Sequence, residues 1–176
     1  MKNMKRILVY AISIVVCILL ETTVFQNLAL ASVVPNLMII LVSGFGLARG
    51  KNEGMLLGFF GGLVHDVLFG NLLGFCALLY MIIGYLNGCF SRIFYGDDDI
   101  KLPILLVAGS DLLFGIMTYI LLFLLKSDFN FRFYLRSIIM PEVIYTALVS
   151  IILSHVIMKV NFRLEEEEKR SAGKFV

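Results

Sequence analysis

The chain has 176 residues, of which 60% are hydrophobic and 16% are charged, and its mean hydropathy is +0.94. Soluble domains contain about 25% charged residues, so this composition indicates an integral membrane protein with no room for a folded soluble domain. A net charge of only +2 gives no electrostatic support to nucleic-acid binding.

Six apolar runs have lengths near those that a bilayer requires, about 20 residues with a range of roughly 17–25. We therefore expect six membrane helices, at Ile7–Leu28, Val33–Ala48, Gly54–Phe69, Leu72–Phe90, Leu102–Leu125 and Leu135–Met158. The third and fourth must be separate, because one helix from Gly54 to Phe90 would be about 55 Å long. The prediction is an all-α six-helix membrane bundle over residues 1–160, followed by a charged cytoplasmic tail over residues 161–176.

The first apolar run follows basic residues, and Ala29-Leu30-Ala31 looks like a cleavage site, as in a signal peptide. The apolar core ends near Leu20, which leaves an unusually long gap before that site. We therefore interpret this segment as a membrane helix that stays in the protein.

Two prolines are expected to shape helices. Pro35 opens the second predicted span, where proline fits a first helical turn. Pro141 lies inside the sixth span and is expected to kink it, since proline removes one backbone hydrogen bond.

Glycine recurs every four residues around the third predicted helix. The positions are Gly50, Gly54, Gly58 and Gly62, then Gly70 and Gly74, with Asp66 in the skipped position. Residues four apart lie on one ridge of a helix, and a ridge of small residues lets another membrane helix approach closely. We predict that Gly50, Gly54, Gly58 and Gly62 are helix-packing positions.

Basic residues test the helix count independently, because cytoplasmic segments of membrane proteins are enriched in Lys and Arg. With six spans and a cytoplasmic N-terminus, 12 basic residues lie inside and 3 lie outside, namely Lys126, Arg132 and Arg136. Merging the third and fourth spans would give 8 against 7. The distribution favours six spans with both termini in the cytoplasm.

Four acidic residues lie within or near the predicted spans: Glu21, Asp66, Asp111 and Glu142. Ionisable groups in a membrane are costly and usually face a protein interior or a polar cavity. Glu21 and Asp66 are expected near the outer ends of their helices, whereas Asp111 and Glu142 lie deeper. The deeper pair either faces an internal polar cavity, as ion transport would need, or maintains the bundle through hydrogen bonds.

The predicted outer segment before the sixth span is dense in aromatic and basic residues. They are Phe129, Phe131, Arg132, Phe133, Tyr134 and Arg136. Such a segment is either an interfacial aromatic belt or an extracytoplasmic docking strip for a partner.

No motif in the sequence supports catalysis, a metal site or a bound cofactor. The three cysteines, Cys17, Cys76 and Cys89, lack metal-ligand spacing and read as small hydrophobic residues. His65 and Asp66 are adjacent and point about 100° apart on a helix, so we do not predict a metal site there. Nucleophile–base arrangements and phosphate-binding loops are also missing, and an enzyme is not expected.

Several short motifs, in this order, resemble the family of the rod shape-determining protein MreD. They run from Pro35 to Val42, from Arg49 to Gly54, from Gly58 to Asp66, and from Leu73 through Gly84-Tyr85-Leu86. The size, the six-span layout and the proline in the last helix are also similar to that family. One departure is Tyr145-Thr146, where the family often has Tyr-Asn.

The resemblance implies a non-catalytic scaffold subunit of the bacterial cell-elongation complex in the cytoplasmic membrane. Such a subunit would bind MreC and work alongside MreB, RodA and the elongation transpeptidase in peptidoglycan synthesis. The expected contact surfaces are the glycine ridge and the outer aromatic strip.

The resemblance also implies a fold like the substrate-binding subunits of energy-coupling-factor transporters. The alternative function is therefore a small-molecule-binding transporter subunit. The scaffold is favoured, because the predicted outer loops offer few polar groups besides Asn27, Asn71 and Asn130.

Overall fold

The computed structural model describes residues 2–29, 33–70, 72–92, 101–126 and 131–172. The helices are α1 (Lys2–Asn27), α2 (Leu37–Arg49), α3 (Lys51–Phe69), α4 (Phe75–Cys89), α5 (Lys101–Lys126), α6 (Phe131–Tyr134) and α7 (Met140–Ala172). A 3-10 turn at Phe90–Arg92 follows α4, and a π-helical turn at Leu135–Ile139 joins α6 to α7. The described part contains no strand, which confirms the all-α prediction.

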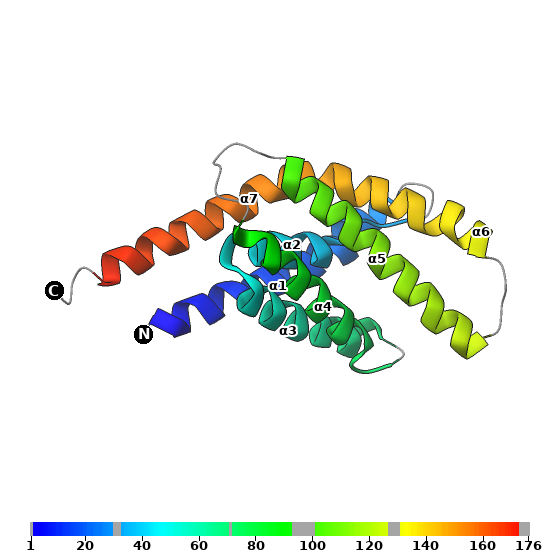
Figure 1. Cartoon of the computed structure of the whole chain (residues 1–176), viewed down its shortest axis with the longest axis horizontal. Helices are drawn as coiled ribbons and strands as arrows, with labels where there is room; N and C mark the ends of the chain where they lie inside the picture. The colour runs from blue at the N-terminus through cyan, green and yellow to red at the C-terminus, as the bar shows by residue number, and fades with distance from the viewer. Residues whose placement is uncertain (1, 30–32, 71, 93–100, 127–130, 173–176) are drawn as a thin grey trace.

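The helices form a bundle around α2 (Figure 1). This short helix contacts α1, α3, α4, α5 and α7, and its residues from Leu37 to Val42 are all buried. A helix that is apolar on every side is stable only when other helices surround it. The short second apolar run therefore forms the centre of the protein.

Asn36 and Gly50 fix where α2 begins and ends. Asn36 caps its first turn, because the Asn36 side chain accepts a hydrogen bond from the Ile39 amide at 3.1 Å. Pro35 precedes this cap, so the prediction that it lies in the first helical turn is wrong. At the other end, Gly50 adopts a φ of +97° and separates α2 from α3.

The sixth predicted span is one nearly continuous helix from Phe131 to Ala172, interrupted by the π-helical turn. That turn ends directly before Met140 and Pro141, and the Met140 amide bonds to the Leu135 carbonyl. A π-helical turn places one extra residue in a helix and can absorb the local disturbance that proline causes. The irregularity around Pro141 is thus a change of hydrogen-bond register before the proline.

Three helical segments are long and apolar enough to cross a membrane: Arg6–Asn27, Lys101–Leu121 and Phe131–Leu164. Leu37–Arg49 and Phe75–Cys89 are shorter apolar helices. The protein is thus a membrane protein. Figure 1 shows both termini at one end of the bundle and α6 at the other. Which end faces the cytoplasm, and the limits of each span, stay predictions.

Candidate functional site

The glycines of α3 meet the backbone of α4. A Cβ atom on Gly54 would lie 2.5 Å from the Gly84 carbonyl oxygen, and one on Gly58 would lie 2.2 Å from that of Tyr80. A Cβ on Gly62 would lie 2.5 Å from the Ala77 Cα. These atoms belong to the backbone and cannot rotate away, so α3 and α4 can pack this closely only with glycine at all three positions.

The predicted packing positions do not all act in the same way. Gly50 lies between two helices, and a Cβ there would meet only the Ser91 side chain at 3.6 Å. Its importance is its positive φ, which disfavours other residues. Conversely, Gly84 and Gly88 of α4 complete the contact with α3. They were not among the predicted packing positions, although their own four-residue spacing could have indicated them.

The glycine ridge is therefore enclosed within the bundle. Because α4 covers Gly54, Gly58 and Gly62, the expectation that this ridge is a surface for another protein is wrong.

Asp66 lies at the far end of the α3–α4 contact and caps α4 from outside that helix. Its Oδ2 accepts hydrogen bonds from the amides of Gly74 and Ala77, both at 3.0 Å, and its Oδ1 accepts one from the Cys76 amide at 3.1 Å. The first amides of a helix have no partner within it and carry partial positive charge. A buried carboxylate is thus stabilised by three amides, and the turn between the two helices is fixed.

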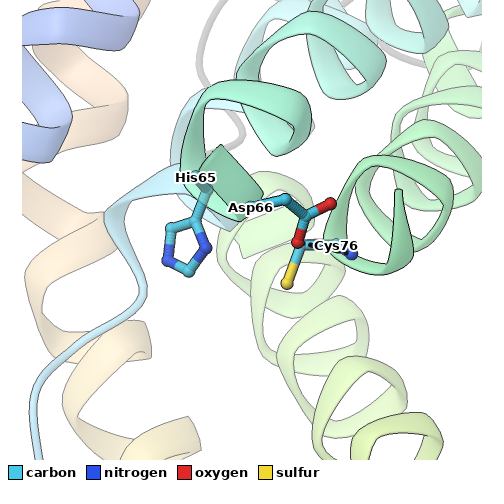
Figure 2. A group of neighbouring side chains, drawn as sticks. All are labelled: His65, Asp66 and Cys76. Atoms are coloured by element: carbon cyan, nitrogen blue, oxygen red, sulfur yellow. Dashed lines mark hydrogen bonds between the residues drawn. The ribbon is translucent and has the colours of Figure 1, made fainter. Parts of the chain in front are cut away.

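His65 and Cys76 flank this carboxylate (Figure 2). One ligand atom from each of His65, Asp66 and Cys76 lies within 4.8 Å of the others. The His65 ring also lies against Phe69 and Tyr80, with ring centroids 5.3 and 6.0 Å apart. Its Nδ1 atom is buried and has no hydrogen-bond partner.

The other three acids come from different helices. Glu21 of α1 and Glu142 of α7 each lie close enough to Asp111 of α5 for their charges to interact. Asp111 is only 2% exposed and its carboxyl group lies near the Thr146 side chain. Neither carboxyl oxygen meets the distance and angle of a hydrogen bond with any described residue. Tertiary structure therefore brings the two deeper acids, Asp111 and Glu142, together with Glu21, which was expected near the outer end of its helix.

Hydrogen bonds beside these acids join α2, α4 and α7. The Asn36 amide donates to the Thr146 hydroxyl at 3.1 Å, and the Tyr80 hydroxyl donates to the Asn36 side chain at 3.2 Å. Tyr80 is fully buried and stacks on Phe114, with ring centroids 5.0 Å apart. Thr146, the departure from the family pattern, thus accepts a hydrogen bond at the start of α2.

A second polar cluster lies toward the end of the bundle that carries the termini. Glu53 of α3 pairs with Arg6 of α1, accepts a hydrogen bond from Tyr10, and lies 3.8 Å from Arg49. Arg49 in turn bonds to Asn161 of α7. This cluster was not predicted; only the four-residue spacing of Arg49 and Glu53 could have indicated part of it.

An apolar groove of about 650 Å³ lies between α1 and α3, next to the Glu53 cluster. Its lining includes Ile14 and Val15 of α1 and Phe60 and Leu63 of α3, with Arg6 and Glu53 as the charged residues.

Some residues of the outer aromatic strip pack against α5, and others are exposed. Tyr134 and Phe131 lie against Tyr119 of α5, at centroid distances of 5.1 and 4.9 Å, whereas Phe133 is 69% exposed. Arg132 and Arg136 are exposed. Phe129 lies outside the described residues.

One comparison with known proteins gives a match. The family model described as rod shape-determining protein MreD matches residues 1–161 of the chain. No curated protein and no solved structure matches it, so the likeness to energy-coupling-factor subunits stays a prediction.

Proposed function

The chain belongs to the MreD family of rod shape-determining membrane proteins, and from that membership we propose that it is a non-catalytic scaffold subunit of the cell-elongation complex. In this role it binds MreC in the bacterial cytoplasmic membrane and works alongside MreB, RodA and the elongation transpeptidase. The single observation that carries the proposal is the family match over residues 1–161.

The packing of the bundle supports a scaffold. Three α3 glycines fit against α4 backbone atoms, and α2 is enclosed by five helices, so the interior has little freedom to rearrange. The buried polar residues Asn36, Asn87 and Thr146 form hydrogen bonds between helices. A rigid bundle of this kind suits a subunit that holds partners in position.

The outer aromatic strip is the surface we propose for MreC. It lies at the end of the bundle opposite both termini, and it combines an exposed aromatic ring, Phe133, with the exposed cations Arg132 and Arg136. Aromatic and arginine side chains supply most of the binding energy at many protein interfaces. The glycine ridge cannot serve, since α4 covers it.

The test is affinity purification from native membranes. We expect MreC to copurify with the unaltered protein and to decrease at least several-fold in Phe133→Ala combined with Arg132→Ala. Ile152→Ala is the matched control, because Ile152 is as exposed as Phe133, at 71% against 69%, but lies in α7, 16 residues after Arg136, the last residue of the strip.

The outcomes separate the proposals. Unchanged MreC recovery with the strip variant would reject the strip as the contact but leave the scaffold function standing. Copurification of an energy-coupling ATPase module, with no MreC, would reject the scaffold and favour the transporter subunit.

A further inference from the structure

Three side chains of different chemistry meet where α3 ends and α4 begins. His65 offers a ring nitrogen, Asp66 a carboxylate oxygen and Cys76 a sulfur, and one such atom from each lies within 4.8 Å of the others (Figure 2). Neither the scaffold function nor the family match assigns any task to this group. We propose that it is a binding site for a single zinc ion.

The geometry is close to that of a zinc site. Three atoms no more than 4.8 Å apart share a centre at most about 2.8 Å from each of them, whereas zinc bonds measure about 2.0–2.3 Å. At that upper limit a ligand atom would move inward by about 0.5–0.8 Å, a distance that rotations of the His65 and Cys76 side chains can cover.

The three ligand atoms can bind a metal at little cost in existing hydrogen bonds. Asp66 Oδ1 accepts a hydrogen bond from the Cys76 amide, and the carboxylate also contacts the Cys76 thiol, a contact that is given up when zinc replaces the thiol proton. His65 Nδ1 is buried without a partner, and a metal bond would satisfy it. Zinc binding at the sulfur displaces the thiol proton to solvent, since the thiolate is the form that coordinates.

The carboxylate is already held in place for this task. Its three backbone hydrogen bonds fix its position and orientation at the start of α4. Ligands of protein metal sites are usually oriented by such outer hydrogen bonds. Capping of α4 and metal binding therefore use different lone pairs of the same carboxylate and do not exclude each other.

The ligand set selects zinc over the common hard cations. Magnesium and calcium take oxygen ligands, whereas a set of nitrogen, oxygen and sulfur suits zinc. Three protein ligands leave the fourth tetrahedral position for a water molecule. His65 and Cys76 are only partly buried, so an ion can reach the site from the turn.

The test uses the full chain, purified in detergent with a tag that contains no histidine. After incubation with zinc and removal of free metal, elemental analysis should give one zinc per chain. Cobalt at the same site should produce the near-ultraviolet absorption band of a cobalt–thiolate bond, which reports sulfur coordination directly.

Two pairs of variants assign the ligands. Cys76→Ser and His65→Gln should each lower zinc affinity at least tenfold, and Cys76→Ser should abolish the cobalt–thiolate band. Cys89→Ser and His155→Gln are the matched controls and should leave both readouts unchanged, because Cys89 and His155 are exposed and lie outside the group.

Substoichiometric zinc in the unaltered protein would overturn the proposal. So would equal zinc binding by Cys76→Ser and Cys89→Ser. Should Cys76→Ser fail to fold, His65→Gln decides the matter alone: retention of full zinc affinity by that variant rejects the site.

Discussion

Replacing Gly58 by alanine is expected to force α3 and α4 apart. The new Cβ would lie 2.2 Å from the Tyr80 carbonyl oxygen and 2.5 Å from its carbonyl carbon, whereas ordinary contacts begin at 3.4 Å. The two backbones must therefore separate by about 1.2 Å. Such a shift would also disturb the buried Tyr80 ring, which stacks on Phe114 and donates a hydrogen bond to Asn36.

The expected net cost is about 2 kcal/mol of the free energy of unfolding. Overpacking costs about 1–3 kcal/mol, and the upper end applies here because the clash is with backbone atoms that cannot rotate away; alanine recovers up to about 1 kcal/mol of this through its higher helix propensity. Gly109→Ala is the matched control, since a Cβ at Gly109 in α5 would meet no atom within 4 Å. That variant gains the propensity without the clash and should be as stable as the unaltered protein or slightly more stable.

The assay is thermal or denaturant unfolding of both variants in one detergent, followed by circular dichroism. Equal unfolding midpoints for Gly58→Ala and Gly109→Ala would refute the reasoning. The added methyl group would then cost no more at the α3–α4 contact than at an open position on α5.

Three further predictions concern polar residues. Glu53→Gln should destabilise the protein by about 1 kcal/mol in the same assay, because Arg6 and Arg49 both lose a charged partner and the Arg49 side chain is only 8% exposed. The control Glu166→Gln, at an exposed position of α7, should have no effect. Asp66→Ala should cost about 2 kcal/mol in chelator-treated protein, since three backbone amides at the start of α4 lose their acceptor. A smaller loss is expected with Asp66→Asn, because one acceptor oxygen remains. The double variant Asp111→Asn and Glu142→Gln should still copurify with MreC and support rod growth in depleted cells, because the substitutions keep side-chain size and hydrogen-bonding capacity. If that variant assembles normally and growth fails, a titrating or transport role becomes the better explanation.

The number and approximate positions of the helices follow from the sequence alone. Backbone polar groups in lipid must bond within their own segment, so each apolar run near bilayer length forms a helix. The turn between α3 and α4 followed from length, because a continuous helix there would be too long for a bilayer. The glycine spacing likewise predicts a close helix contact on α3, although it does not identify the partner helix.

Which surfaces meet was decided only by the tertiary structure. In a membrane, a face that packs on another helix and a face that meets lipid are both apolar, so periodicity does not separate them. The sequence therefore could not show that α4 covers the glycine ridge, or that Glu53 reaches Arg6, 47 positions earlier in the chain. Nor could helical angles place Cys76 beside Asp66, because the turn before α4 brings the cysteine back toward α3.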